Sequence, residues 1–301
     1  MSTFFKADAS EFLAHGHQRI ALGVAYNGRH YHGWQRQPYG HISVQEKLED
    51  ALTKVANEPI KVMCAGRTDA GVHASAQVVH FDTLAQRPLR AWTHGGNMNL
   101  PDDVAIQWAH PVGEKFHARF AASARRYRYV IYNHPMRPAL MDKEVSWNYR
   151  PLDVNQMQTA ADYLLGTHDF SSFRASSCQA NNPVRTMHHL NVVAAGNYIV
   201  LDVRANAFLQ HMIRNLAGLL IKVGTGEAAP EWALEVLMAK DRRVNAATAP
   251  PYGLYFVDAE YDASFGLPKG PLGPHFLAPW MNAEKSVLIN SNSNPSGWFI
   301  C

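Results

Sequence analysis

Apolar positions in the first third of the chain follow first a strand period and then a helix period. They alternate with small residues over residues 20–26, which predicts a strand, and Asn27 and Gly28 predict the turn that ends it. Ser43 and Glu46 form a capping box that opens a helix, whose apolar stripe runs to Asn57. Further strands are predicted at residues 60–64, 77–81 and 104–110, and a shorter helix at 89–98. The predicted order is β-α-β-β-α-β.

The second half of the chain repeats that order. A strand over residues 126–133 ends in Tyr-Asn, as the first strand does, and a helix over 153–165 has Asp153 at its cap and Gly166 at its stop. The other predicted elements are a hairpin of residues 184–193 and 198–206, a long helix at 208–223, a helix after Pro230 and a strand at 254–261. Two comparable halves suggest an internal duplication whose edge strands join as one sheet, which is an α+β fold.

A length of 301 residues predicts either two modules or one large sheet built from two halves. We expect an N-terminal extension at residues 1–18, a first α/β half at 19–115, a second at 116–265 and a partly disordered Gly/Pro-rich tail at 266–301.

Composition removes several classes of protein. The hydrophobic content of 47% is that of a globular chain, the start shows no signal-peptide pattern, and no apolar run is long enough to cross a membrane. Three widely spaced cysteines, at positions 64, 178 and 301, form neither a disulfide framework nor a zinc pattern. These features predict a cytoplasmic protein.

Positive charge is concentrated in one stretch, although the formal net charge is only +3. Eighteen of the 28 basic residues are Arg, whose planar group suits phosphate contact and base stacking. Residues 114–137 combine six basic residues and one acid with interleaved aromatic residues. That mixture is typical of a surface that holds phosphates and stacks bases, and a solvated strand face is the alternative.

Other chemistries find little support in the sequence. The sixteen histidines include no His-Glu-x-x-His pattern, and His188 and His189 point to opposite faces of a predicted strand, so no metal site is expected. Nucleotide-binding and Gly-x-Ser-x-Gly motifs are missing as well, so no cofactor is expected. Cys64 ends a predicted strand and is interpreted as a small core residue.

The strongest candidate for chemistry is the loop at residues 64–74. It places one carboxylate, Asp69, between two predicted strands, and Gly66 and Gly71 allow backbone geometry and close approach that a Cβ would obstruct. Residue types and spacing leave two interpretations open. Asp69 is either a turn residue that caps its own backbone or a functional carboxylate.

This loop resembles the signature of the TruA family of pseudouridine synthases, which reads here Gly-Arg-Thr-Asp-Ala-Gly-Val-His at residues 66–73. The similarity extends from about residue 20 to residue 276, with a slightly longer segment at 38–41 and a Pro135 where a basic residue is common. The resemblance implies the pseudouridine synthase fold, with two ferredoxin-like halves, a mostly antiparallel sheet with helices packed on it, and a central basic cleft. It also implies isomerisation of uridine to pseudouridine at positions 38, 39 and 40 of tRNA, by a homodimer that contacts the anticodon stem-loop and the elbow.

The same resemblance implies a role for each matching residue. Asp69 corresponds to the nucleophile, and Arg214 in the motif at residues 208–215 to its ion-pair partner. Tyr127 corresponds to the residue that stacks on the target base, Leu254 to a pocket wall and Arg67 to the residue that assists base flipping. Further positions that correspond to RNA contacts are Arg87, Phe116, His117, Ala118, Arg119 and Phe120.

Two other classes of function compete with this interpretation. A noncatalytic tRNA-binding or chaperone protein could use the same basic cleft. A base-releasing hydrolase would need two carboxylates near the bond, and only Asp69 is well placed in the sequence.

Overall fold

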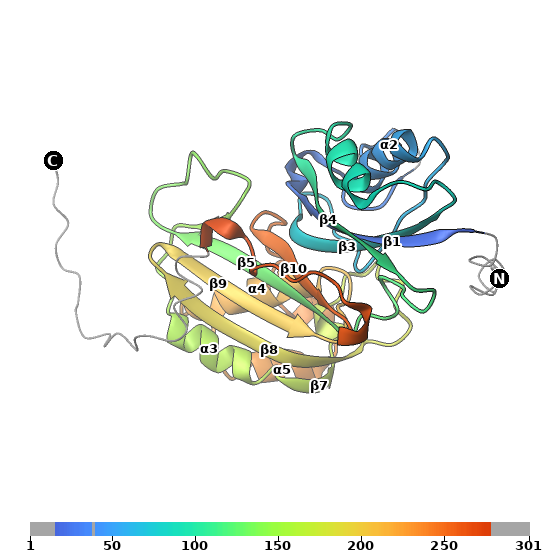
Figure 1. The fold of residues 1–301 in the computed structure, drawn as a ribbon. Coiled ribbons are helices and arrows are strands. Elements are labelled where there is room, and N and C mark those ends of the chain that lie inside the picture. The colour runs from blue at the N-terminus through green and yellow to red at the C-terminus, as the bar shows by residue number, and fades with distance from the viewer. Residues whose placement is uncertain (1–15, 38–39, 278–301) are drawn as a thin grey trace.

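The computed structural model describes residues 16–37 and 40–277, which form an α+β fold built on one ten-stranded sheet (Figure 1). Within these residues the α-helices are α2 (Val44–Ala56), α3 (Val154–Asp162), α4 (Met212–Gly224) and α5 (Trp232–Ala239). The strands are β1 (Gln18–Tyr26), β2 (Met63–Cys64), β3 (His73–Thr83), β4 (Val104–Val112), β5 (Ala124–Asn133), β6 (Ser146–Asn148), β7 (Gly166–Asp169), β8 (Val184–Ala195), β9 (Tyr198–Ala205) and β10 (Leu254–Glu260).

The strand order confirms the predicted fold class and supports the predicted duplication. The sheet runs β4-β1-β3-β10-β5-β9-β8-β7, with β2 beside β3 and β6 beside β5. The first half therefore has the order β4-β1-β3-β2 and the second half the order β10-β5-β9-β8, so the four main strands of each half occupy equivalent places. Pairing is antiparallel except between β10 and β3 and between β5 and β6, as far as the chain is described.

The two halves meet where β3 changes its partner. Residues 79 and 80 of β3 pair with β2, whereas His73 and Ala74 pair in parallel with Tyr255 and Phe256 of β10. The chain between β2 and β3, residues 65–72, therefore turns at the junction of the halves. This is the segment that carries Asp69.

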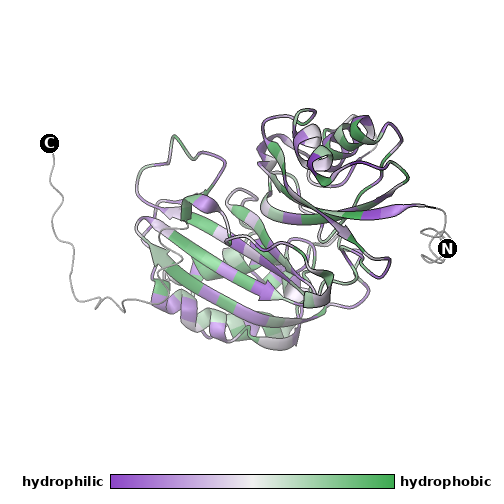
Figure 2. Cartoon of the chain, viewed as in Figure 1, coloured by the Kyte–Doolittle hydropathy of each residue, from purple (hydrophilic) through white to green (hydrophobic). Residues whose placement is uncertain are grey.

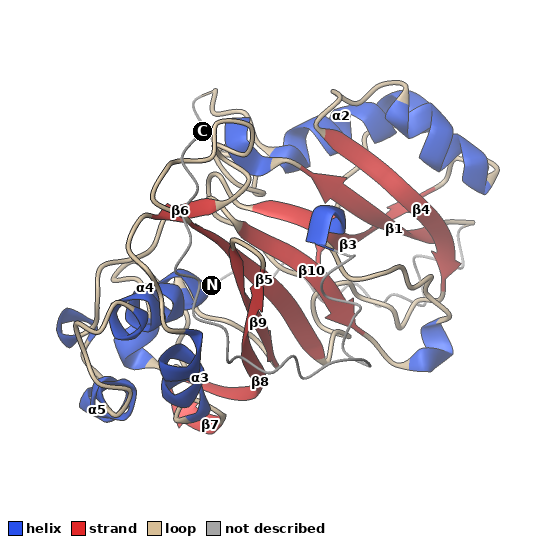
Figure 3. Cartoon of the chain, turned by 90° about the vertical axis from the view of Figure 1, so that its left-hand side faces the viewer, coloured by secondary structure: helices blue, strands red, loops and turns tan. Residues whose placement is uncertain are grey.

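Helices α3, α4 and α5 cover one side of the second half, and α2 packs against the first half (Figure 3). Apolar side chains from both halves and from these helices form one continuous core. Hydrophobic and hydrophilic positions alternate along the strands and along α3, as expected for elements that bury one face (Figure 2). A second, smaller core on the opposite face includes Val130, Val200 and Leu277.

Most predicted elements are present, with instructive differences at their ends. The capping box at Ser43 is confirmed, since its side chain accepts the Glu46 N–H, and the helix ends at Asn57 in the left-handed region. The helix predicted from residue 208 is wrong at its start, because it begins at Met212 after His211 adopts a φ of 62°. Only two residues of the strand predicted at 60–64 pair with β3. Strands β6 and β7 were not predicted, since three or four residues give no periodic signal.

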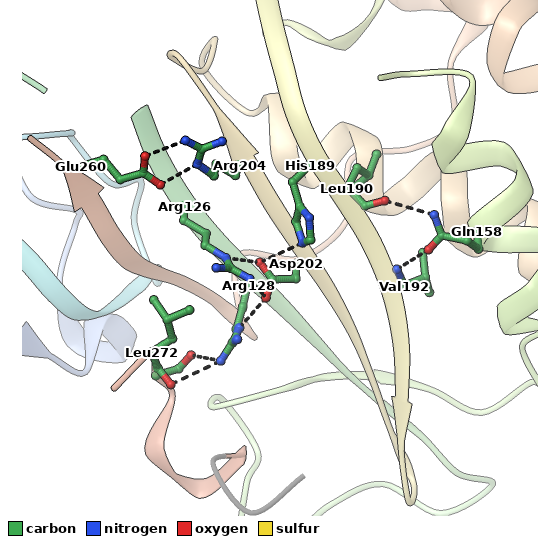
Figure 4. Close-up of polar contacts among 11 residues, drawn as sticks. Arg126, Arg128, Gln158, His189, Leu190, Val192, Asp202, Arg204, Glu260 and Leu272 are labelled. Carbon is green, nitrogen blue, oxygen red and sulfur yellow. Dashed lines mark hydrogen bonds and ion pairs between the residues drawn. The ribbon is translucent and has the colours of Figure 1, made fainter. Parts of the chain in front are cut away.

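The basic stretch at 114–137 is used partly inside the fold. Arg126 and Arg128 both bind the buried Asp202 carboxylate, at 2.6 and 2.8 Å, and Arg128 also donates to the carbonyl of Gly273 (Figure 4). Because a buried carboxylate needs such partners, these arginines serve the second half of the sheet. The interpretation of the whole stretch as a phosphate surface was therefore too broad.

The described part of the predicted tail, residues 266–277, packs on the sheet through Leu272, Gly273 and Leu277. Predictions for residues 1–15, 38–39 and 278–301 lie outside the described residues. No helix in the described ranges is both long enough and apolar enough to cross a membrane.

Candidate active site

The loop of residues 65–72 is fixed from several sides before it presents any side chain. Arg125 donates to the carbonyl of Ala65, and Gln77 Nε2 donates to the carbonyl of Gly66 at 2.7 Å. The Trp34 N–H donates to the carbonyl of Thr68 at 3.0 Å, and the Thr68 hydroxyl shares a hydrogen bond of 2.8 Å with Tyr26. Backbone groups of the loop are thus satisfied by several different segments, which holds the loop in one conformation.

The two glycines of the loop have different reasons for being glycine. Gly71 has a φ of +78°, a left-handed conformation that side chains other than glycine rarely adopt. At Gly66 an added Cβ would lie 3.1 Å from the Phe256 ring and 3.4 Å from the Tyr127 hydroxyl. The close approach of the Gly66 backbone brings the loop against the aromatic residues of β5 and β10.

The Asp69 carboxylate faces α4 and does not cap its own turn. Its Oδ2 atom lies 3.6 Å from Nε2 of His211 and 3.8 Å from Nη1 of Arg214. The Val72 N–H is bound by the backbone carbonyl of Asp69, at 3.2 Å, and no hydrogen bond within the described ranges ends on the carboxylate. The interpretation of Asp69 as a turn-capping residue is therefore not supported by the geometry.

Arg214 is held where it can balance that charge. Its Nε donates to the carbonyl of Ala249 at 2.8 Å, and the Ala249 N–H donates back to the carbonyl of Arg214 at 3.1 Å. The side chain is only 15% exposed, whereas the Asp69 side chain is 31% exposed. The arrangement leaves the carboxylate reachable from solvent and its cationic neighbour largely covered, and a covered cation interacts more strongly because water screens it less.

His211 is a candidate site residue that sequence reasoning missed. It stands three residues before Arg214 in the motif at residues 208–215, so about one helical turn separates the two positions. Burial lowers the pKa of His211, the nearby Arg214 and Arg242 lower it further, and Asp69 opposes the shift. His211 is therefore held neutral beside the Asp69 carboxylate, where it can donate or accept a hydrogen bond.

The Tyr127 side chain lies next to the loop of residues 65–72, close to Gly66. It lies on β5 with its ring edge-to-face against Phe208 and Phe256, at centroid distances of 5.1 and 5.0 Å, and it is 7% exposed. Burial, with Tyr26 and Asp69 nearby, raises its pKa, so the hydroxyl stays protonated. That hydroxyl has no hydrogen-bond partner among the residues that the structure describes. The two flanking rings lock the orientation of Tyr127 and leave its polar tip available.

Leu254 and Arg67 occupy different settings around the same loop. Leu254 is buried at the start of β10, paired with Tyr129 of β5. Arg67 is exposed and makes no hydrogen bond or ion pair with the described residues. A free, exposed guanidinium two residues before Asp69 can swing toward whatever enters the site.

The positions expected to contact RNA divide by exposure. Phe120 is 77% exposed, stacks on His117 with ring centroids 4.3 Å apart and lies under Arg119. Arg87 is also exposed, and it donates to the carbonyl of Val55. Phe116 and Ala118 are fully buried, so their side chains cannot reach RNA in this structure. Phe116 packs against Tyr261 and Phe265 as part of the core, and RNA contact at these two positions stays a prediction.

Neither Cys64 nor a metal-binding group offers a second candidate site for catalysis in the described residues. Burial raises the pKa of the Cys64 thiol to about 12, so this cysteine stays protonated and is a poor nucleophile. Across residues 16–37 and 40–277, no group of three or more His, Cys, Asp or Glu side chains is arranged to hold a metal ion.

Comparisons with known proteins give a consistent family assignment. The model of a tRNA pseudouridine synthase family matches residues 23–121 and 160–262. A tRNA pseudouridine synthase A of Pseudomonas aeruginosa is 60% identical over 270 residues, which cover 90% of this chain and 95% of the relative. Proteins of the same name from Alcanivorax borkumensis and Coxiella burnetii are 56% and 55% identical, covering 88% and 86% of this chain and 99% of each relative.

The position of His211 between the charges of Asp69 and Arg214 gives a test of the site's electrostatics. The pKa of His211 should fall further in Asp69→Asn, because the charge that raises it is removed, and should rise in Arg214→Gln, because a charge that lowers it is removed. Imidazole proton shifts in an NMR titration measure both changes. His80 is the internal control, since its pKa of about 3 is set mainly by burial elsewhere in the core. Equal His211 titrations in all three proteins would contradict the geometry.

Proposed function

This chain belongs to the tRNA pseudouridine synthase family, so its reaction is the isomerisation of uridine to pseudouridine in tRNA, and we propose that it acts at positions 38, 39 and 40 of the anticodon stem-loop. The observation that carries the proposal within this chain is the Asp69 carboxylate, which is presented on a fixed loop toward a neutral histidine and a covered arginine.

The reaction is an isomerisation, so it takes no electrons and no chemical group from a cofactor. The N-glycosidic bond breaks, the uracil turns while it stays bound, its C5 joins the ribose, the C5 proton leaves and N1 takes up a proton. One ionised carboxylate is required, either to attack covalently or to accept a ribose proton. Asp69 is suited to both roles, because a carboxylate that is free of turn hydrogen bonds keeps its lone pairs for the substrate.

Arg214 places a positive charge 3.8 Å from that carboxylate, where it can balance the negative charge when the nucleotide displaces water. A charge of opposite sign within about 4 Å favours the ionised form, and burial by substrate would otherwise disfavour it. The Ala249 carbonyl fixes the Arg214 guanidinium in place, so little reorganisation is needed during the reaction. Arg214 is thus an electrostatic partner of Asp69 in the proposed mechanism.

A uridine in a stem must leave the helix before its sugar can be attacked, and the protein side chains must offset the lost stacking. Tyr127 is proposed as the platform for the flipped base, which contributes roughly 1–3 kcal/mol by stacking. Leu254 forms a wall beside it, and Arg67 fills or steadies the place that the base leaves. The exposed Arg119, Phe120 and Arg87 extend the RNA surface away from the loop.

Nucleoside analysis of tRNA from a strain without this chain tests the function. Loss of pseudouridine at positions 38, 39 and 40, with recovery when the chain is restored, is expected. An unchanged profile would favour a noncatalytic tRNA-binding protein, and product RNA with missing bases would favour a hydrolase. Either result would refute the proposed reaction.

Tyr127 variants separate stacking from hydroxyl chemistry. A phenyl ring still stacks and an isobutyl group does not, so Tyr127→Phe should retain base flipping whereas Tyr127→Leu should lower the flipping equilibrium by about 5-fold to 150-fold. Fluorescence of a 2-aminopurine next to the target uridine reports flipping, and release of tritium from C5 reports turnover. If Phe and Leu are equally inactive in flipping, the platform role is wrong.

We also propose that the protein acts as a homodimer in the cytoplasm, since the anticodon stem-loop and the tRNA elbow together are longer than one subunit readily spans. Sedimentation at micromolar protein should then show a species of twice the chain mass. A sole species of 33.6 kDa would refute the dimer.

A further inference from the structure

A basic cavity that is open to solvent lies beside the start of α4, to which the hydrogen bond between Arg242 and Asn215 connects it. Its volume is about 480 Å³, and it is formed by the 3-10 turn Ser171–Phe173 with the chain that follows it, and by the C-terminal end of α5. The polar residues that line it are Ser171, Arg174, Ser176, Lys240, Asp241 and Arg242. Three cations and two serines therefore surround one acid.

That acid is already neutralised from outside the cavity. The Asp241 carboxylate accepts three hydrogen bonds from the guanidinium of Arg243, the shortest 2.6 Å long. Arg174 and Lys240 make no salt bridge or side-chain hydrogen bond within the described ranges. Asp169 is the other acid in their electrostatic range, and its carboxylate accepts the Ser171 N–H at 2.9 Å. The cavity keeps a net positive charge.

Arg242 is fixed by neutral groups, which leaves its charge uncompensated. Its Nη2 donates to Oδ1 of Asn215 at 3.1 Å and to the Thr248 hydroxyl at 2.9 Å. Asn215 is fully buried and donates to the carbonyl of Phe173, so the turn, the arginine and α4 form one hydrogen-bonded unit. The Nε and Nη1 groups of Arg242 have no partner among the described residues and are free to donate.

The cavity is tied to the residues that face Asp69. Asn215 follows Arg214 directly in α4, and the Ala175 N–H donates to the carbonyl of Gln210, the residue before His211. The charge of Arg242 also acts on the His211 imidazole. An anion in the cavity would therefore lie next to the partners of Asp69.

We propose that this cavity binds one backbone phosphate of the substrate RNA beside the target uridine, and so sets the register of the strand as the nucleotide flips. Guanidinium and ammonium groups with hydroxyl donors are the chemistry that recognises a phosphate diester. The inference rests on the proposed function, because it takes the RNA bound at Asp69 as the source of the phosphate. Arg174, Lys240 and Arg242 are positioning residues in this account, since they touch no reacting atom.

Neutral-linkage scanning tests the site. Transfer RNAs are assembled with one phosphate at a time replaced by an uncharged methylphosphonate on either side of the target, and their affinity is measured by filter binding. One linkage should lower the affinity of the wild-type protein about tenfold, the effect of removing a charged hydrogen-bonded partner. The double variant Arg174→Gln, Lys240→Gln, which keeps Arg242, should bind natural tRNA about tenfold more weakly and lose less affinity at that linkage than the wild-type protein does. Its slope of log affinity against log salt should fall by about one for each phosphate that the variant no longer binds.

Lys222→Gln is the control for loss of a positive charge outside the cavity. It removes one positive charge from the same helix layer but lies at the other end of α4, over the ring of Trp232 at 4.5 Å. It should keep the full methylphosphonate penalty. The proposal would be overturned if every neutral linkage lowered the affinity of the double variant as much as that of the wild-type protein. It would also be overturned if inorganic phosphate competed with tRNA for the cavity arginines while no single linkage distinguished the two proteins.

Tritium release from natural tRNA by the wild-type protein is read in parallel. Absence of tritium release would refute the proposed reaction. The affinities of the wild-type protein and the double variant for the neutral-linkage tRNAs would still test the phosphate site. Release with no linkage-specific change in the double variant would refute the phosphate site alone.

Discussion

The parallel pairing of β10 with β3 is the interaction on which the site depends. It consists of two residue pairs, Tyr255 with His73 and Phe256 with Ala74, and the His73 and Tyr255 rings stack at 4.7 Å. This pairing joins the two halves into one sheet and places the last turn before β3 against the start of α4. Asp69 belongs to one half and Arg214 to the other, so neither half can form the site alone.

The division of the arginines follows from the same architecture. Arg125 holds the loop by its Ala65 carbonyl, and Arg126 and Arg128 hold the buried Asp202, so three nearby residues of β5 serve the interior. Arg67, Arg174 and Arg119 have guanidinium groups without a carboxylate partner among the described residues, and these can meet RNA. Net charge alone could not separate the two groups, because both contribute equally to it.

Periodicity and capping chemistry in the sequence predicted the order of the long elements, since each has enough residues to show its period. These patterns did not predict the elements whose bounds are set by tertiary contacts. The left-handed His211 ends the apolar run before α4 can begin, and β6 and β7 are too short to show alternation. The turn around Asp69 was located from its glycines, but spacing left its role open between capping and chemistry. The side chain's direction toward α4 decides against capping, and that direction depends on the pairing of β10 with β3.

Other parts of the site were beyond the reach of sequence reasoning. The resemblance places Phe116 and Ala118 at RNA-contacting positions, yet both side chains are fully buried, and Phe116 packs against Tyr261 and Phe265. The cavity at Arg242 draws its cations from two segments about 65 residues apart, and no local pattern marks such a meeting.

The central claim is that Asp69 is the carboxylate that acts on the target uridine, and release of tritium from uracil C5 measures it directly. Forming the new carbon–carbon bond must expel the C5 hydrogen, so each turnover is counted. Asp69→Asn keeps the size of the side chain and removes its charge, and we expect it to release no tritium while it binds tRNA with nearly unchanged affinity. Release at the wild-type rate by Asp69→Asn would contradict the account and return Asp69 to a residue of the turn.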